Sequence, residues 1–247
     1  MVGSRREISG KVVLLSGASG GIGSELVRAF LDAGAAEIVT ASRHPAAAVD
    51  ARVRPQMLDV TDTASVATAA AAFAERVDIM VNCAGANANS RIFLPPTLDG
   101  AREEMEVNYF GLLNMVRAFA PAMQRRRQGT IVNMLSMVSL VNSPRMATYS
   151  ASKAAAFSLT QAVRAELMPY GIHVCAMLPS ATDTAMSAHL NIPKLKPATV
   201  ADAVINAIRE GIEDAHEGLI HADVYQALRT DPKSVERQMA EKLGHTN

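Results

Sequence analysis

The sequence is poor in net charge and in cysteine. Its 24 basic and 24 acidic side chains cancel, so no overall field attracts nucleic acid or an anionic membrane, and we expect neither as a partner. Its 2 cysteines, Cys83 and Cys175, are too few and too far apart for a disulfide framework or a metal-ligand cluster. We therefore expect no metal and a cytoplasmic location.

Long apolar runs are also missing. No uninterrupted stretch reaches the roughly 18 apolar residues of a membrane span. The apolar run 12–15 is shorter than the roughly 7 to 15 residues of a signal-peptide core, so no leader is expected. Neither a flexible linker nor a repeat of roughly 20 to 50 residues divides the chain. With 49% hydrophobic residues, the sequence predicts a compact soluble protein whose residues 1–247 form a single domain.

Short aliphatic runs alternate with longer alanine-rich stretches, which is typical of βαβ units. The apolar runs do not alternate with polar residues, as expected for a parallel sheet covered on both faces. The pattern predicts an α/β, doubly wound, Rossmann-type fold with a seven-stranded parallel sheet and helices on both faces. We expect strands near 12–15, 37–41, 53–58, 78–82, 130–135, 172–178 and 218–221, and helices near 22–33, 63–75, 101–126, 151–170 and 200–212.

A glycine-rich turn follows the first expected strand. Its glycines have the spacing Gly-x-x-x-Gly-x-Gly through Gly17, Gly21 and Gly23. Positions without side chains let the backbone approach a pyrophosphate, and the helix starting near Ile22 directs free N–H groups toward it. A tight turn without a ligand is the alternative. The binding interpretation gives these candidate cofactor residues: Gly17, Ser19, Gly20, Gly21, Ile22 and Gly23.

Tyr149 and Lys153 are spaced four residues apart at the start of an expected helix. Residues i and i+4 lie on the same helix face, so the ammonium of Lys153 can lie near the phenol of Tyr149. At roughly 4 Å this attraction is worth on the order of 4 kcal/mol before desolvation, so we expect the pKa of Tyr149 to move toward neutral. Such a tyrosine can exchange a proton with a carbonyl or an alcohol. The alternative is an exposed pair without a catalytic role.

These motifs together resemble the short-chain dehydrogenase/reductase family over nearly the whole chain. The resemblance rests on the glycine turn, on Asn82-Cys83-Ala84-Gly85, on Asn108, and on Ser136 thirteen residues before Tyr149. It implies that Tyr149 is the acid/base, Ser136 binds the substrate oxygen, Lys153 holds the nicotinamide ribose and lowers the pKa of Tyr149, and Asn108 supports a proton relay through water. Asn82, Ala84 and Gly85 are expected to contact the cofactor.

The end of the second expected strand bears on the choice of cofactor. An NAD site usually has an acidic residue there, whereas this chain has Ser42 followed by Arg43. A guanidinium can bind a 2′-phosphate through two hydrogen bonds, so the pattern resembles NADP-preferring members, with NAD as the alternative. By the same resemblance Asp59, followed by Val60, would contact the adenine. A solvated Arg43 and a turn-forming Asp59 are the alternatives.

The resemblance weakens toward the end of the chain. Pro179 is followed by Ser180 where the family usually has glycine, although Thr182 and Thr184 still resemble the nicotinamide-binding group. Residues 179–197 are expected to form a substrate loop or lid, and residues 222–247 a helical tail in place of the family's usual ending. The changed tail favours a homodimer over a homotetramer. The sequence predicts an NADP(H)-dependent oxidoreductase acting on a small carbonyl or alcohol. The alternatives are the same reaction with NAD(H) and a non-catalytic dinucleotide-binding regulator or scaffold, against which the intact set of catalytic residues argues.

Overall fold

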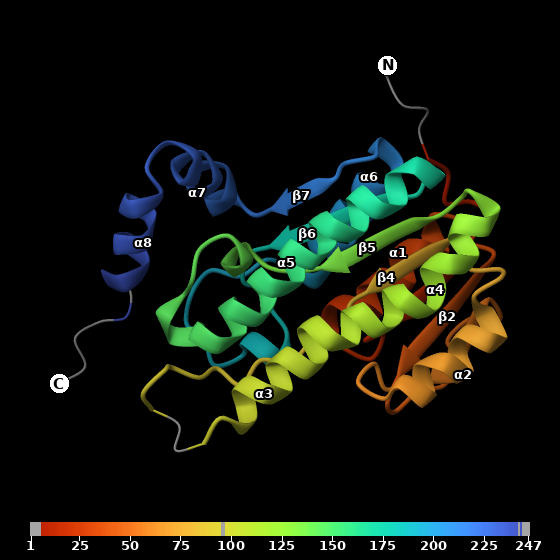
Figure 1. Cartoon of the computed structure of the whole chain (residues 1–247), viewed down its shortest axis with the longest axis horizontal. Coiled ribbons are helices and arrows are strands. Elements are labelled where there is room, and N and C mark those ends of the chain that lie inside the picture. Colours follow the sequence, from red (N-terminus) through yellow and green to blue (C-terminus); the bar gives the residue numbers. More distant parts are fainter. Residues whose placement is uncertain (1–5, 95–96, 242, 244–247) are drawn as a thin grey trace.

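The computed structural model describes residues 6–94, 97–241 and 243, without the side chains of 219–223. Strands and helices alternate along most of the chain (Figure 1). The strands are β1 (Val12–Ser16), β2 (Glu37–Ser42), β3 (Val53–Met57), β4 (Ile79–Asn82), β5 (Thr130–Met134), β6 (His173–Pro179) and β7 (Asp214–Glu217). The helices are α1 (Gly21–Asp32), α2 (Thr63–Phe73), α3 (Asp99–Met105), α4 (Leu112–Arg126), α5 (Ala147–Leu167), α6 (Pro197–Glu210), α7 (Leu219–Thr230) and α8 (Pro232–Glu241).

The strands form one parallel sheet in the order β3-β2-β1-β4-β5-β6-β7. The chain starts in the middle of the sheet, moves outward to β3, and returns to β4 on the other side of β1. Val13 accordingly pairs with Ile38 of β2 and with Ile79 of β4. Such a reversal of strand order opens a crevice at the carboxyl ends of the strands, which lie at the left of Figure 1. The predicted seven-stranded doubly wound fold is confirmed.

Helices cover both faces of the sheet. Helices α1 and α6 pack against each other on one face, where Val13 and Leu15 of β1 join their apolar side chains. Helices α2, α4 and α5 cover the other face, and Leu14 of β1 contributes to that core. Successive residues of β1 therefore enter opposite cores, which explains why the strand reads as an unbroken apolar run. The two cores hold the sheet rigid beneath the loops at its carboxyl edge.

Three predicted elements differ from the structure. The last strand is Asp214–Glu217 rather than 218–221, because Gly218 has φ 131° and begins the turn into α7. The helix expected at 101–126 is divided by a π-helical segment, Glu106–Gly111, between α3 and α4. The helix expected from 151 already begins at Ala147, after a short 3-10 turn at Pro144–Met146.

The expected loop 179–197 contains a 3-10 turn at Ala185–Ser187 and an isolated parallel bridge between Thr182 and Leu195. The bridge ties the two ends of this loop together close to the sheet. The expected tail consists of α7 and α8, and Val235 and Met239 of α8 are buried. In the described part of the chain, no helix is long and apolar enough to cross a membrane.

Candidate active site

The glycine turn is built by close backbone packing. Gly17 has φ 70°, and a Cβ there would lie 2.6 Å from the backbone nitrogen of Ala84. A Cβ on Gly23 would lie 2.2 Å from the carbonyl oxygen of Gly17. The turn therefore requires glycine at both positions, whether or not a ligand is bound. Because α1 has neither a side-chain cap nor an acidic residue in its first turn, its N–H groups and positive dipole end remain available to an anion.

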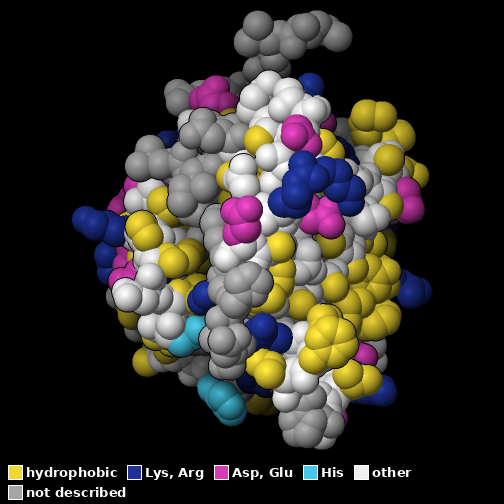
Figure 2. Space-filling view, turned by 90° about the vertical axis from the view of Figure 1, so that its left-hand side faces the viewer, with side chains coloured by type: hydrophobic (Ala, Val, Ile, Leu, Met, Phe, Trp, Pro, Cys, Tyr) yellow, Lys and Arg dark blue, Asp and Glu magenta, His cyan; other side chains and the backbone are white. Residues whose placement is uncertain are grey.

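A cleft of about 570 Å³ runs along this turn at the carboxyl edge of the sheet. Figure 2 views the molecule from this edge and shows hydrophobic side chains gathered on one side of it. Most of the cofactor residues suggested by the sequence line the cleft: Gly17, Ser19, Gly20, Gly21, Ile22, Gly23, Ser42, Arg43, Asp59, Val60, Ala84, Gly85 and Thr184. Asn82, Pro179 and Thr182 are buried next to the cleft and do not line it.

The far end of the cleft is polar and partly basic. Arg43 and His44 follow β2 and are exposed there. Asp59 also lines the cleft near Arg43. Its Oδ1 accepts hydrogen bonds from the backbone N–H (2.9 Å) and the hydroxyl (2.8 Å) of Thr61. These bonds, assisted by the charge of Arg43, lower the pKa of Asp59. The arrangement leaves the guanidinium of Arg43 at the cleft wall, with Asp59 ionised beside it.

Ser136 and Tyr149 lie together beyond the end of β5. Ser136 caps the 3-10 turn Met137–Ser139, where its hydroxyl accepts from the N–H of Val138 at 3.4 Å, and it lies close enough to Tyr149 to lower the pKa of the phenol. Lys153 lies one helical turn further along α5, and its Nζ is 5.8 Å from the centre of the Tyr149 ring. The ammonium donates a hydrogen bond to the carbonyl oxygen of Met134 at 2.9 Å. The three side chains predicted from sequence spacing therefore lie together. They do not line the cleft itself, but a Cβ on Gly85, which does line it, would lie 3.6 Å from Nζ of Lys153.

The expected lowering of the pKa of Tyr149 does not occur in this structure. Burial raises the pKa of the phenol to about 12, and the hydrogen bond from Ser136 opposes this only in part. Burial also lowers the pKa of Lys153 to about 8. The sequence argument failed because it treated the pair as partly solvated, whereas both side chains are buried. Tyr149 is therefore held in its protonated form.

Asn108 lies in the π-helical segment. Its side-chain Oδ1 accepts from the N–H of Ala86 (3.0 Å), and its Nδ2 donates to the carbonyl of Ala86 and to the hydroxyl of Ser152, both at 2.9 Å. Ser152 in turn donates to the carbonyl of Tyr149 at 2.8 Å. Asn108 thus connects the loop after β4 to the helix that carries Tyr149. Single-turn π segments are frequent at functional sites.

A void of about 10 Å³ lies behind these residues, lined in part by Asn82, Asn108, Met134 and Lys153. This is about the space that one water molecule needs. The Oδ1 atom of Asn82 is buried and has no hydrogen-bond partner among the residues that the structure describes. A water in the void would satisfy that atom, in keeping with the relay implied for Asn108.

The loop after β6 forms the opposite wall. Ser180 does not adopt a positive φ, so the replacement of the family's glycine does not strain the backbone here. The hydroxyl of Thr182 donates to the carbonyl of Ser180 at 3.0 Å, and Thr184 begins the turn Ala185–Ser187. A Cβ on Gly21 would lie 2.8 Å from Cγ2 of Thr184. The two walls therefore approach each other closely at Gly21.

Sequence reasoning missed several residues of the site. His44, Thr61, Glu103 and Glu106 also line the cleft. The most unexpected is Glu104, which is completely buried on α3. Its position among charged neighbours in Arg102-Glu103-Glu104 suggests a solvated helix, so nothing local to the sequence reveals its burial. Within the described ranges, no group of three or more His, Cys, Asp or Glu residues could hold a metal ion.

The residues at the cleft fit a dinucleotide on structural grounds. The helix end and the glycine backbone suit a pyrophosphate, and the volume of about 570 Å³ is within the range of cofactor sites. Arg43 lines the cleft after β2, whereas Ser136, Tyr149 and Lys153 lie together behind the wall that Gly85 forms. A ligand that is anionic in its middle and reactive at one end would match this order.

Comparisons with known proteins agree with this arrangement. The family model described as short chain dehydrogenase matches residues 11–194. The chain therefore belongs to the short-chain dehydrogenase/reductase family, whose members are oxidoreductases that use a nicotinamide dinucleotide.

Two relatives and one solved structure illustrate the similarity. The chain is 39% identical to a galactitol 2-dehydrogenase (L-tagatose-forming) of Cereibacter sphaeroides, over 73% of this chain and 74% of the relative. It is 31% identical to a 3-ketodihydrosphingosine reductase of Bacteroides thetaiotaomicron, over 75% of this chain and 69% of the relative. A short chain dehydrogenase from Burkholderia cenocepacia, solved in complex with NADP, is 36% identical with a TM-score of 0.91, covering 95% of this chain and 99% of that one.

Proposed function

We propose that this protein transfers a hydride between NADP(H) and a carbonyl or alcohol substrate, with Tyr149 as the acid/base. The observation that carries the proposal is the grouping of Tyr149 with Ser136 and Lys153, where Lys153 adjoins Gly85 in the wall of a dinucleotide-sized cleft. A nicotinamide dinucleotide bound there would supply or accept the hydride. Ser136 orients the substrate oxygen toward Tyr149, and Tyr149 Oη gives that oxygen a proton in the reducing direction.

Lys153 and Asn108 assist this proton transfer. The ammonium of Lys153 is fixed on the carbonyl of Met134, which leaves two of its N–H groups to donate to a ribose hydroxyl or a water. Asn108 fixes Ser152 and Ala86 next to the void of about 10 Å³. A water in that void would return a proton toward Tyr149 after each turnover.

The preference for NADP is supported by Arg43. Its guanidinium lines the cleft beside Ser42, where a carboxylate would repel a 2′-phosphate. The similar Burkholderia cenocepacia structure contains NADP. A structure from Burkholderia phymatum with the same fold, 24% identical with a TM-score of 0.81, contains NAD. NAD therefore remains the alternative cofactor, and Arg43 is the residue on which the choice depends.

The names of the relatives indicate a class of reaction but do not identify the substrate of this protein. One is named for oxidation of a sugar alcohol and another for reduction of a ketone on a long-chain base, which supports carbonyl and alcohol interconversion in general. Met186 lines the cleft and Met146 contacts Asn87 next to it, which supports an adaptable apolar pocket.

The free thiols Cys83 and Cys175 support a cytoplasmic location. We also propose that the protein is a homodimer or a homotetramer, which light scattering can test.

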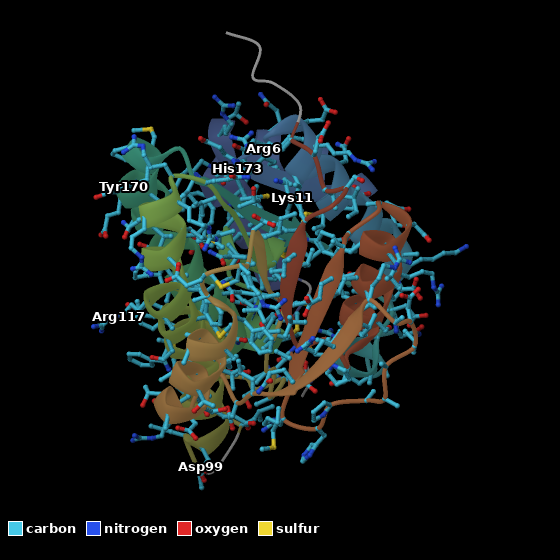
Figure 3. All side chains as sticks on the ribbon, turned by 90° about the vertical axis from the view of Figure 1, so that its right-hand side faces the viewer. Arg6, Lys11, Asp99, Arg117, Tyr170 and His173 are labelled. Carbon is cyan, nitrogen blue, oxygen red and sulfur yellow. The ribbon has the colours of Figure 1, made fainter. Side chains whose placement is uncertain are left out.

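Tyr149→Phe tests the catalytic proposal. Binding of NADPH, followed by fluorescence, should be unchanged, whereas kcat for NADPH-dependent reduction across a carbonyl panel should fall roughly 10²- to 10⁴-fold. Tyr170→Phe, on the exposed end of the molecule opposite the cleft (Figure 3), is the matched control. Equal rates for wild type and Tyr149→Phe would refute the role of the tyrosine. A wild type that binds the dinucleotide and reduces no carbonyl would favour the regulator or scaffold.

Arg43→Asp tests the cofactor preference. The ratio of kcat/KM with NADPH to that with NADH should fall at least about tenfold, because a charged hydrogen bond to the 2′-phosphate is lost. Arg117→Asp makes the same charge change on the exposed face of α4 (Figure 3) and should leave the ratio unaltered. If both variants keep the wild-type ratio, Arg43 does not bind the phosphate.

A further inference from the structure

Glu104 is an unusual residue for its surroundings. It lies in the last turn of α3 with no exposed surface, and it is the one buried carboxylate among the residues that the structure describes. Burying a carboxylate is costly unless it is well paired. Its Oε2 atom, moreover, has no hydrogen-bond partner in the described part of the chain. Stability alone would favour an apolar side chain here, so the presence of a carboxylate calls for a functional reason.

The other oxygen of Glu104 holds the loop that follows β4. Oε1 accepts a hydrogen bond from the backbone N–H of Ala88 at 2.7 Å. One turn further along the same helical run, Asn108 holds both backbone groups of Ala86. One turn earlier, a Cβ on Gly100 would lie 2.6 Å from Cβ of Ala88. Gly100, Glu104 and Asn108 therefore form one continuous contact, here called the anchoring face, along which residues 86–88 lie.

The anchored loop also sets the start of the catalytic helix. The carbonyl of Ser90 accepts a hydrogen bond from the N–H of Ala147, the first residue of α5, at 3.0 Å. Asn89 has φ 53°, a left-handed conformation that is uncommon outside glycine. Such a strained residue persists only when its surroundings fix it. A loop fixed at Ala86, Ala88 and Ser90 thus determines where α5 begins, two residues before Tyr149.

The charge of Glu104 also reaches Tyr149. Burial is the main cause of the raised pKa of the Tyr149 phenol. Negative charge on Glu104, and on Cys83 when it is ionised, raises this pKa further, whereas the hydrogen bond from Ser136 lowers it. These groups come from α3, from the segment after β4 and from the turn after β5. On α5 itself, the ammonium of Lys153 lies 5.8 Å from the tyrosine ring. Glu104 is thus the buried acidic residue that opposes ionisation of the phenol.

We propose that Glu104 is a positioning residue: its carboxylate fixes residues 86–90 on the anchoring face and so fixes the start of α5, two residues before Tyr149. The consequence for catalysis rests on the proposed function. In that reaction the hydride adds to the carbonyl carbon and the proton of Tyr149 Oη passes to the carbonyl oxygen. The phenolate left behind then takes a proton from water.

Three variants test whether the acceptor oxygen of Glu104 anchors the loop. Glu104→Ala removes both the acceptor and the charge, whereas Glu104→Gln keeps an Oε1 acceptor for Ala88 and removes only the charge. Asp99→Asn, a charge change on the exposed start of the same helix (Figure 3), is the matched control. Should Glu104→Ala fail to fold, Glu104→Asp, one methylene shorter, replaces it as the variant that loses the Ala88 contact.

Hydrogen exchange of the cofactor-free protein measures the anchoring directly. The amides of residues 86–90 should exchange at least about tenfold faster in Glu104→Ala than in wild type. Glu104→Gln and Asp99→Asn should exchange like wild type. Because this measurement needs no substrate, it tests the anchoring even if the protein reduces no carbonyl, a result that would count against the proposed function instead.

Steady-state reduction measures the consequences for catalysis. Glu104→Ala should raise KM for the carbonyl severalfold, and Glu104→Gln should restore it. Wild-type exchange in Glu104→Ala, or a KM for the carbonyl in Glu104→Ala equal to that of wild type, would overturn the proposal.

Discussion

The two edges of the sheet differ in how many buried polar atoms lack a partner. At the amino edge (Figure 3), Arg126 donates to the carbonyl of Ala74 at 2.9 Å, and Arg164 donates to the carbonyl of Val174 at 3.0 Å, although Nε2 of His173 is buried without a partner in the described part of the chain. At the carboxyl edge, four residues each bury such an atom: Asn82, Asn89, Glu104 and Thr148. Unpartnered atoms are thus more numerous at the edge where open α/β sheets bind ligands.

Titratable groups follow the same division. Tyr149 and Lys153 are buried at the carboxyl edge, and burial shifts the pKa of each in the direction that favours its neutral form. At pH 7 the phenol is neutral while the ammonium of Lys153 is still charged, and perturbed groups of this kind are typical of functional sites. Asp214, near the amino edge, instead pairs with Arg164 at 2.6 Å, with both side chains partly exposed. The difference suggests that substitutions at the two edges should affect stability and activity in opposite proportions.

The largest expected contrast lies at the two ends of β1. Gly10 and Gly17 have nearly equal positive φ, 73° and 70°, but only Gly17 has backbone where a Cβ would be. Gly10→Ala should cost about 1 kcal/mol of unfolding free energy for its left-handed conformation. Gly17→Ala should cost about 1 to 3 kcal/mol more, and should weaken NADPH binding at least about tenfold because the turn must open.

Urea unfolding and NADPH titration measure this contrast between the two glycine variants. Equal losses of stability with unchanged NADPH affinity would mean that the crowding at Gly17 has no role in the cleft.

Lys153→Met and Lys11→Met form the second contrast. Because the pKa of Lys153 falls from 10.5 to about 8 on folding, the unfolded chain binds more protons between these values, and this residue makes stability rise with pH there. At pH 7 its buried ammonium is a cost. Lys153→Met should therefore gain about 1 to 3 kcal/mol at pH 7 while losing turnover.

Lys11→Met, at the amino edge (Figure 3), should neither gain stability at pH 7 nor lose turnover. Thermal unfolding at pH 7 and at pH 10 compares the variants, and the gain of Lys153→Met should shrink at the higher pH. A loss of stability in Lys153→Met at both pH values would show that its hydrogen bond to Met134 outweighs the cost of burial.

Local patterns predicted most of the fold and much of the site. The glycine turn, the apolar strands and the Tyr149–Lys153 spacing each depend on residues close in sequence, and the parallel topology then brings strand ends to one edge. What the sequence missed depends on contacts between distant segments. The π segment around Asn108 reads as ordinary helix, and the burial of Glu104 follows only once residues 86–88 lie against α3.

The same limit explains two of the wrong expectations. The last strand was placed at 218–221 because that stretch is apolar, but pairing with β6 selects Asp214–Glu217. The pKa of Tyr149 was expected to fall because spacing reveals a neighbouring ammonium but does not reveal how much water surrounds the pair. Register and burial are both properties of the assembled molecule.

The smallest predicted effect concerns His173 at the amino edge, where Figure 3 shows it near Arg6. Burial, with Arg6 and Arg164 nearby, lowers its pKa from 6.5 to about 4. Between these values the unfolded chain binds more protons than the folded protein, so the histidine makes stability fall as pH falls from 6.5 toward 4. His173→Gln should remove about 1 to 2 kcal/mol of this pH dependence and leave kcat unchanged.

Urea unfolding at pH 7 and pH 5 measures that slope, and the exposed His189→Gln is the matched control. A slope equal to that of wild type would show that His173 is not the group responsible. A changed kcat would show instead that the amino edge is coupled to the cleft, because His173 starts the strand that ends at Pro179 beside the Thr184 wall. The division between a stabilising edge and a reactive edge would then fail along β6.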